Sequence, residues 1–234
     1  MLWVEVEKRL GDFCLDVRFK TESGVTGLFG PSGGGKTTLV NMISGLLRPD
    51  RGKIVLGDIV LFDGAARIDL PVHRRHIGYV FQEGRLFPHL SVRRNLDYGR
   101  RMRSLPGDPA QLARIISLLE IGHLLDRRPG RLSGGERQRV AIGRALLMRP
   151  RLLLRPRLLL LDEPLASLDP ARKAEILPYL ERLRDEIGIP MVYVSHQAAE
   201  LRRIATAVVR LNGGRVESIG GSELLDRADP DAVL

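Results

Sequence analysis

The nine residues GPSGGGKTT, at positions 30–38, constrain the fold of this chain more than any other stretch. They satisfy the pattern G-x-x-x-x-G-K-[ST], and they lie between a short apolar strand pattern, Val25–Phe29, and a helical pattern at 36–46. Glycines let successive backbone N–H groups turn inward, and the start of the following helix adds positive potential. The segment therefore predicts a phosphate-binding loop between a strand and a helix.

Each residue type in this loop has a chemical use. Lys36 is expected to reach the outer phosphates of a nucleotide, and the Thr37 hydroxyl can ligate Mg²⁺. The residues expected to bind the nucleotide are Gly30, Pro31, Ser32, Gly33, Gly34, Gly35, Lys36, Thr37 and Thr38.

The segment LLLLDEP, at 158–164, supplies acidic groups for the same chemistry. Its four leucines place Asp162 at the carboxyl end of a buried strand, where α/β proteins bind their ligands. Asp162 is expected to hold Mg²⁺ through water, and Glu163 to polarise a water for attack on the γ-phosphate. Taken alone, an apolar run that ends in two acids also fits a strand followed by a solvated turn. The loop at 30–38 favours the functional interpretation.

The stretch before this strand contains a duplication, because RPRLLL occurs at 149–154 and again at 155–160. Only the second copy is contiguous with Asp162, so we predict that the second copy supplies the strand. The first copy is expected to form a bulging loop at about 149–156, with Leu152–Leu154 partly exposed.

Strand patterns that alternate with helical patterns predict an α/β protein with a largely parallel sheet. Alternating residues near the N-terminus and two Gly-containing hairpin signals add antiparallel strands. We expect one domain, with a P-loop NTPase (RecA-like) core and an antiparallel β subdomain at 1–84 and 157–234. An inserted α-helical subdomain is expected at 85–156.

The net charge of +9, from 37 Lys and Arg against 28 Asp and Glu, allows two interpretations. One is a nucleic-acid or membrane-surface partner, and the other is an Arg-rich solvated surface. Scattered arginines without an aromatic stacking platform favour the second. The single cysteine, Cys14, excludes an internal disulfide and suits a reducing cytoplasm. No apolar run approaches the roughly 18 residues that a membrane span requires.

A second Gly-rich loop, LSGGERQ at 132–138, opens a helix but has no Lys. One nucleotide rarely needs two such loops, so the second is expected to serve another copy of the chain. With this motif the sequence resembles the ATP-binding cassette ATPases over nearly its whole length. The resemblance implies that two chains pair head to tail, each ATP being held by the loop at 30–38 of one chain. The second chain then contributes Ser133, Gly134, Gly135 and Asp169.

The same resemblance implies roles for other positions. Gln82, in YVFQ, matches the glutamine that senses Mg²⁺ and links to a membrane partner. His196, in YVSH, matches the histidine that contacts the γ-phosphate and positions water, beside Glu163 as the base. Phe13 is a candidate for stacking on adenine, and an ordinary core phenylalanine is an almost equal expectation.

Within the family, GRLFPHLSVRRNLDYG and IPMVYVSHQAAEL resemble the ATPase subunits of bacterial molybdate importers. The resemblance implies an ATPase for molybdate or tungstate import, peripheral on the cytoplasmic face of the inner membrane. Its partners would be integral membrane permease subunits and, indirectly, a periplasmic oxyanion-binding protein. Such subunits usually carry a C-terminal oxyanion-binding domain, which a chain ending at Leu234 is expected to lack.

Three alternatives remain open. An importer ATPase for sulfate, ferric iron or another small solute would carry the same motifs. A soluble cassette ATPase acting on nucleic acid is compatible with the charge, but residues 86–95 resemble a permease-binding surface, so no nucleic acid is expected. A P-loop kinase leaves both LSGGERQ and His196 unexplained.

Overall fold

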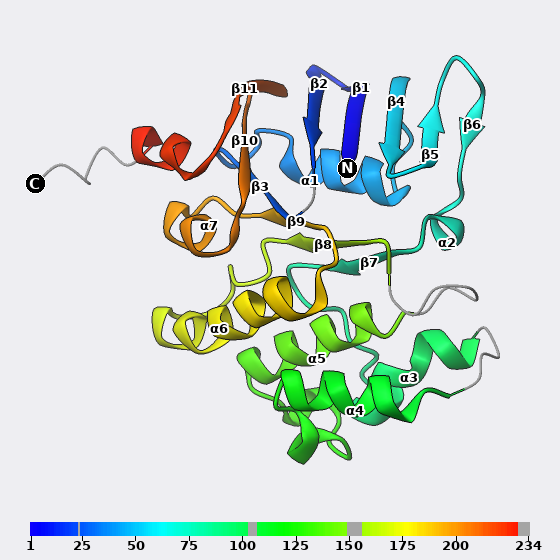
Figure 1. The fold of residues 1–234 in the computed structure, drawn as a ribbon, viewed down its shortest axis with the longest axis vertical. Coiled ribbons are helices and arrows are strands. Elements are labelled where there is room, and N and C mark those ends of the chain that lie inside the picture. Colours follow the sequence, from blue (N-terminus) through cyan, green and yellow to red (C-terminus); the bar gives the residue numbers. More distant parts are fainter. Residues whose placement is uncertain (23, 103–106, 149–155, 229–234) are drawn as a thin grey trace, which may run out of the picture. The chain divides into compact units, whose positions relative to one another are not determined.

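A computed structural model describes residues 1–22, 24–102, 107–148 and 156–228. The chain divides into two compact units, one formed by Met1–Ile77 with Pro190–Leu234 and the other by Gly78–Ile189 (Figure 1). These boundaries differ from those expected at 84/85 and 156/157. Strand β8 (Leu158–Asp162) and helix α6 (Pro170–Ile187) fall in the second unit, where α6 packs against the other helices.

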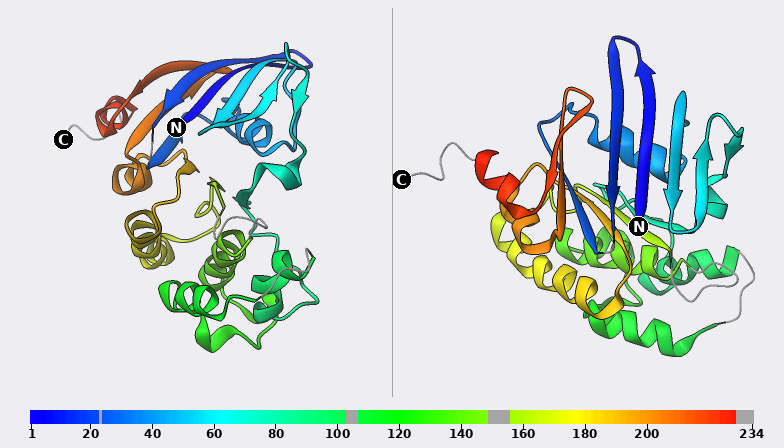
Figure 2. Two further views of the ribbon diagram at one scale, coloured as in Figure 1. Left: turned by 45° about the vertical axis from the view of Figure 1, so that its right-hand side comes forward. Right: turned by 45° about the horizontal axis from the view of Figure 1, so that its top comes forward.

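The first unit contains an antiparallel set of strands. These are β1 (Leu2–Leu10), β2 (Phe13–Thr21), β4 (Arg51–Leu56), β5 (Ile59–Asp63) and β6 (Ile68–Asp69). β1 pairs with both β2 and β4, and Figure 2 shows β1 and β2 as long neighbouring strands. Alternate side chains of β1 and β2 are buried, which is the pattern of strands with one face on a core.

A parallel set of strands continues the sheet of the first unit. β3 (Val25–Phe29) lies between β9 (Met191–Val194) and β10 (Ala207–Asn212) and is parallel to both. β11 (Arg215–Gly220) forms an antiparallel hairpin with β10 and meets β2. All residues of β3 are buried, as a central parallel strand requires. The carboxyl ends of β3 and β9 therefore lie at one edge of the sheet.

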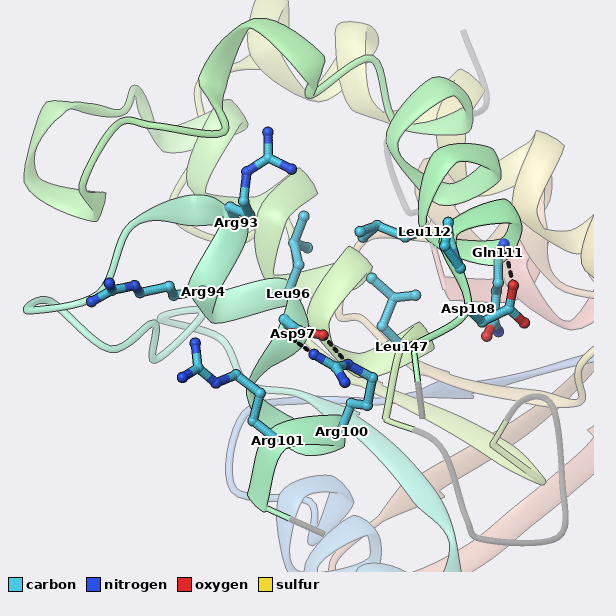
Figure 3. Close-up of a pocket in the computed structure, with 12 residues that line it drawn as sticks. Arg93, Arg94, Leu96, Asp97, Arg100, Arg101, Asp108, Gln111, Leu112 and Leu147 are labelled. Carbon is cyan, nitrogen blue, oxygen red and sulfur yellow. Dashed lines mark hydrogen bonds and ion pairs between the residues drawn. The ribbon is translucent and has the colours of Figure 1, made fainter. Parts of the chain in front are cut away.

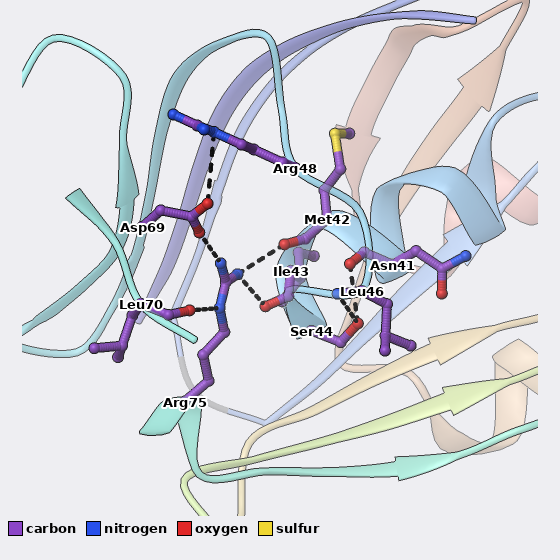
Figure 4. Close-up of polar contacts among 9 residues, drawn as sticks. All are labelled: Asn41, Met42, Ile43, Ser44, Leu46, Arg48, Asp69, Leu70 and Arg75. Carbon is purple, nitrogen blue, oxygen red and sulfur yellow. Dashed lines mark hydrogen bonds and ion pairs between the residues drawn. The ribbon is translucent and has the colours of Figure 1, made fainter. Parts of the chain in front are cut away.

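Helix α1 (Lys36–Ser44) follows β3, and its C-terminal end is held by one buried arginine (Figure 4). Arg75, at the end of α2 (Val72–Arg75), is only 1% exposed and donates to the carbonyl oxygens of Met42 (2.8 Å) and Ile43 (2.9 Å). It also pairs with Asp69 at 3.0 Å. A cation at this position gives the carbonyl groups of the last helical turn a charged donor, at the end of the helix where the dipole is negative. The helix that begins at the phosphate loop is thus anchored at its far end.

The other helices of the first unit are α7 (Ala198–Ile204) and a 3₁₀ segment at Ser222–Ala228. α7 packs on β3, with Leu201 and Ile204 fully buried.

The second unit is mainly helical. Besides α6 it contains α3 (Val92–Met102), α4 (Pro109–Leu118) and α5 (Gly134–Leu146), and 3₁₀ turns at Gly122–Leu124 and Pro129–Arg131 lie between α4 and α5. α3, α4 and α6 all contact α5, and Figures 1 and 2 show the helices grouped around it. β7 (Ile77–Val80), which begins at the boundary, is the neighbour of β8.

The α/β fold class expected from the sequence is confirmed, and so is the strand at Leu158–Asp162, supplied by the second RPRLLL copy. Of the loop expected at about 149–156, residues 149–155 lie outside the described residues. The helix expected at 36–46 ends at Ser44, because Gly45 adopts a left-handed conformation with φ of 85°.

Among the described residues, no helix is both long and apolar enough to cross a bilayer. The same part of the chain contains no group of three or more His, Cys, Asp or Glu residues arranged to hold a metal ion.

Candidate functional site

The loop at 30–38 has the backbone conformation that its glycines were expected to allow. Gly30, Gly33 and Gly35 have φ values of 151°, 78° and 97°. A Cβ atom at Gly30 would lie 1.9 Å from the carbonyl oxygen of Leu211 on β10. Only glycine fits so close to a neighbouring strand, so the sheet itself fixes the start of the loop.

Lys36 is folded across this loop. Its ammonium donates to the carbonyl oxygens of Gly30 (2.7 Å) and Pro31 (2.8 Å), and the residue is 5% exposed. Both of these carbonyl groups are neutral, and phosphate oxygens are stronger partners for an ammonium. Gly35 precedes α1 without a side-chain cap, and the first turn of α1 contains no acid. The loop therefore presents positive potential to an anion.

Phe13, at the start of β2, lies beside the loop. A Cβ atom at Gly35 would be 3.1 Å from Cζ of Phe13, whose side chain is half-buried. This position is compatible both with stacking on a base and with a role in packing under the loop, so the assignment to adenine stays a prediction.

His196 lies at the same edge of the sheet as the loop. In the register of the parallel pair, Leu28 of β3 faces Val194 of β9, and the Ser195 N–H donates to the Leu28 carbonyl at 3.2 Å. His196 follows directly and is exposed. The first unit thus carries the phosphate loop and His196 at the ends of the neighbouring strands β3 and β9, with Phe13 beside the loop.

The acidic pair occupies the end of β8 in the second unit. Asp162 is 7% exposed, and its Oδ2 accepts a hydrogen bond from the Tyr79 hydroxyl on β7 at 3.1 Å. Burial, and then the neighbouring Asp162 carboxylate, raise the pKa of Tyr79 well above its usual value, so the phenol remains a donor. Glu163 has a φ of 46°, in the left-handed region that non-glycine residues rarely adopt. Such backbone strain is concentrated at functional sites.

Gln82 is exposed and lies two residues beyond the end of β7. Because Tyr79, near the end of β7, contacts Asp162 at the end of β8, these two strands end at the same edge. Gln82, Asp162 and Glu163 are therefore gathered within the second unit. Tyr79 was not predicted as part of this site. It also stacks on Phe81, with ring centroids 4.1 Å apart.

The loop LSGGE begins α5 through a reciprocal cap. The Ser133 hydroxyl accepts from the Glu136 N–H at 3.2 Å, and the Glu136 carboxylate accepts from the Ser133 N–H at 2.7 Å. These bonds, the backbone N–H first, lower the pKa of Glu136. The S-x-x-E spacing is a recognisable capping signal that the sequence reasoning did not use.

Two further contacts arrange the neighbouring segment at 167–169. A Cβ atom at Gly134 would lie 2.8 Å from the Leu168 side chain, so the two loops touch. Asp169 caps α6 by accepting from the Arg172 N–H at 3.0 Å. Ser133, Gly134, Gly135 and Asp169 are thus close in the second unit, and the two polar side chains both cap helices.

A different feature of the second unit is a pocket of about 320 Å³ between α3 and the start of α4 (Figure 3). Leu96, Leu112 and Leu147 form its apolar part, and four arginines of α3 surround it. Arg100 is paired with Asp97. No residue predicted to bind nucleotide lines this pocket, so it is separate from the phosphate chemistry.

The chemistry of the predicted Mg²⁺ ligands fits that ion. Thr37, Gln82 and Asp162 offer hydroxyl, amide and carboxylate oxygens, and Mg²⁺ prefers oxygen ligands in sites that also include water and phosphate.

Comparison with known proteins places this chain among the ABC transporters. The sequence model of the ABC transporter family matches residues 15–166, which is more than half of the chain. The chain therefore belongs to the ABC transporter family.

Two of its curated relatives carry the name "Molybdenum import ATP-binding protein ModC". The protein with this name from Rhizobium meliloti is 60% identical over 219 residues, which cover 94% of this chain and 60% of that protein. The one from Rhizobium etli is 58% identical over 241 residues, covering 100% of this chain and 66% of the relative. The chain thus spans less than two thirds of the length of these relatives.

Solved structures show the same fold. A dimeric ATP-binding cassette in a post-hydrolysis state with ADP and phosphate has a TM-score of 0.76 and 26% identity, with 95% of this chain and 99% of that one covered. A Clostridium perfringens protein that is part of the ABC transporter complex cbiONQ has a TM-score of 0.78 and 28% identity. That comparison covers 97% of this chain and 90% of the other.

Proposed function

We propose that this chain binds and hydrolyses ATP with Mg²⁺ as the nucleotide-binding subunit of a molybdate importer. The observation that carries the proposal is the loop at 30–38, which is glycine-rich with three positive φ angles, follows a buried strand and holds Lys36 inside it. A chain uses such a loop to bind nucleotide phosphates through backbone N–H groups and one cation.

The proposed roles follow from the chemistry of each group. Lys36 exchanges its carbonyl partners for the outer phosphate oxygens, and Thr37, Gln82 and Asp162 would hold Mg²⁺. When bound, the ion neutralises charge on the phosphates. Glu163 accepts a proton from the attacking water, and His196 orients that water and the γ-phosphate. Phe13 stacks on the adenine ring.

The second loop explains why two copies are required. Gly134 and Gly135 form the start of α5 after the N-cap Ser133, and this loop has no Lys, so it suits the γ-phosphate side of a nucleotide already bound elsewhere. We propose a homodimer in which these residues and Asp169 complete the site of the partner copy. The dimeric cassette found among the structural relatives supports this arrangement.

The transported ion is inferred from the relatives, because an ATPase of this kind does not itself touch the transported ion. Relatives at 58–60% identity named for molybdenum import support molybdate, whereas sulfate or ferric iron would need the same ATPase chemistry. In this proposal the chain is peripheral at the cytoplasmic face of the inner membrane and binds permease subunits. Uptake of labelled molybdate, with sulfate as competitor, in cells that express the chain with its permease tests the choice of ion.

Replacement of the base tests the ATPase proposal. We expect Glu163→Gln to lower ATP turnover by about 10²–10⁴-fold while ATP binding persists, because the change removes a general base. Glu175→Gln is a matched control, since Glu175 is an exposed carboxylate on α6 of the same unit. Turnover of Glu163→Gln within about tenfold of the parent chain would contradict the assignment.

A further inference from the structure

Three buried polar side chains, close to His196 in the sequence, are hydrogen-bonded to one another. Tyr193 and Ser195 are 0% and 3% exposed, and Glu200 of α7 is 4% exposed. Oε2 of Glu200 accepts a hydrogen bond of 3.0 Å from the Tyr193 hydroxyl and another of 3.0 Å from the Ser195 hydroxyl. We call Tyr193, Ser195 and Glu200 the Glu200 cluster.

The cluster is joined by hydrogen bonds to the turn that carries His196. Tyr193 and Ser195 are two residues apart along the extended chain, so their side chains project from the same side. The Ser195 hydroxyl also accepts from the Gln197 N–H at 3.0 Å. Residues on both sides of His196 are therefore tied, through one hydroxyl, to a carboxylate in the first turn of α7.

Packing alone does not explain a carboxylate at this position. α7 already contacts β3 through Leu201 and Ile204, both fully buried, and an apolar residue would complete such an interface. Burying a carboxylate is costly unless strong hydrogen bonds compensate for lost water. Hydrogen bonds from a hydroxyl to a carboxylate are among the stronger ones. The pKa of Tyr193 lies well above its usual value, mainly because the side chain is buried and secondly because the Glu200 carboxylate is near, so the phenol remains a donor.

We propose that Glu200 is a positioning residue for His196. Through Ser195 it fixes the strand-to-helix turn, so that the imidazole is presented at the edge where the phosphate loop lies. This inference rests on the proposed role of His196 in ATP hydrolysis. Tyr193 supports the carboxylate from the strand side but does not touch the turn.

The cluster offers a graded set of substitutions. Glu200→Gln keeps the shape of the side chain but removes its charge, and Ser195→Ala removes the hydroxyl that joins the turn to Glu200. Tyr193→Phe is the matched control, because it removes one bond to the same carboxylate and leaves the turn intact. Ser195→Thr keeps a hydroxyl and serves as the rescue. His196→Ala measures how much the imidazole itself contributes to ATP turnover.

We expect Glu200→Gln and Ser195→Ala to lower kcat by about 10- to 100-fold while KM for ATP changes by less than about threefold, as misplacement of a catalytic group does. Tyr193→Phe and Ser195→Thr should stay within about threefold of the parent chain. A second measurement is independent of turnover. In ¹³C-histidine NMR spectra, identified with His196→Ala, the His196 ring signal should shift or broaden in Glu200→Gln and Ser195→Ala, and the other four histidines should not.

Two results would overturn the inference, and they are distinguishable. If His196→Ala is inactive but Glu200→Gln keeps both its kcat and the His196 ring signal, Glu200 does not position His196 and the proposed function stands. If His196→Ala retains turnover, the role of His196 in the proposed function fails, and the positioning inference fails with it. Equal losses of kcat and of thermal stability in Tyr193→Phe and Glu200→Gln would reduce the cluster to a structural role and also overturn the proposal.

Discussion

The hydrogen bond between Tyr79 and Asp162 provides a quantitative test of how the acidic site is built. The two residues lie 83 positions apart in the sequence, on β7 and β8, and the phenol donates to a carboxylate that is only 7% exposed. Tyr79→Phe removes the donor and keeps the aromatic ring that stacks on Phe81. The change therefore isolates the hydrogen bond from the packing.

The expected magnitude follows from the charge and burial of the acceptor. Hydrogen bonds to charged groups contribute about 1.5–3 kcal/mol, and a buried acceptor that loses a donor gains no water in exchange. For a chain of this size, 1 kcal/mol corresponds to about 2–4 °C, so the midpoint of thermal unfolding should fall by about 3–12 °C. Differential scanning calorimetry of the chain without nucleotide measures this change.

Tyr98→Phe is the matched control for this experiment. Tyr98 is also a half-buried tyrosine of the second unit, and its ring packs on Phe87 at 4.1 Å, but it lies on helix α3 and not on a strand beside β8. We expect a change within about 0.5 kcal/mol, as for substitutions away from key contacts. Equal shifts in the two variants would refute the account of Asp162 as a carboxylate held by Tyr79.

Three further predictions concern the loop, alkaline pH and the duplication. Gly30→Ala should destabilise the chain by about 3 kcal/mol or more in urea unfolding, because the new Cβ would meet the Leu211 carbonyl oxygen. Gly33→Ala should cost only about 1–2 kcal/mol, because its Cβ would have no atom within 4 Å and the cost comes from the positive φ alone. Equal costs would contradict the close approach. The pKa values of Tyr79 and Tyr193 are raised in the folded state, so their contribution to the free energy of unfolding is complete below a pH of about 10 and is lost as pH rises further. Above that pH the parent chain should therefore lose thermal stability more steeply than a variant with Phe at both positions. Deletion of 149–154 should improve solubility and change ATP affinity by less than about threefold, since phosphate contacts are local, and a tenfold change would refute this.

Local patterns in the sequence were sufficient for much of the fold. Val25–Phe29 is a short apolar run before a glycine-rich loop, and it forms a strand with those bounds. The continuity of Leu158–Asp162 with the acidic pair predicts a strand there, in the second RPRLLL copy, and this segment is the strand β8. In both cases hydrophobic pattern and turn chemistry point to the same element, and such agreement makes a local prediction reliable.

Contacts between distant residues could not be predicted in this way. The bond from Tyr79 to Asp162 depends on which strands are neighbours, and the Glu200 cluster depends on α7 packing back onto the sheet. Nothing in YVFQ or in HQAAE marks these side chains as partners. The reciprocal cap of Ser133 and Glu136 is different, because its spacing is visible in the sequence and could have been used.

Light scattering of Glu163→Gln shows whether two copies of this chain complete each ATP site. With hydrolysis blocked, addition of ATP and Mg²⁺ should convert a monomer into a dimer, because the loop at 30–38 and the loop at Ser133 then bind one nucleotide from two chains. Lys36→Ala in the same background, which removes the phosphate-binding cation, should remain monomeric. A Glu163→Gln chain that binds ATP tightly yet stays monomeric at high micromolar concentration would contradict the shared site.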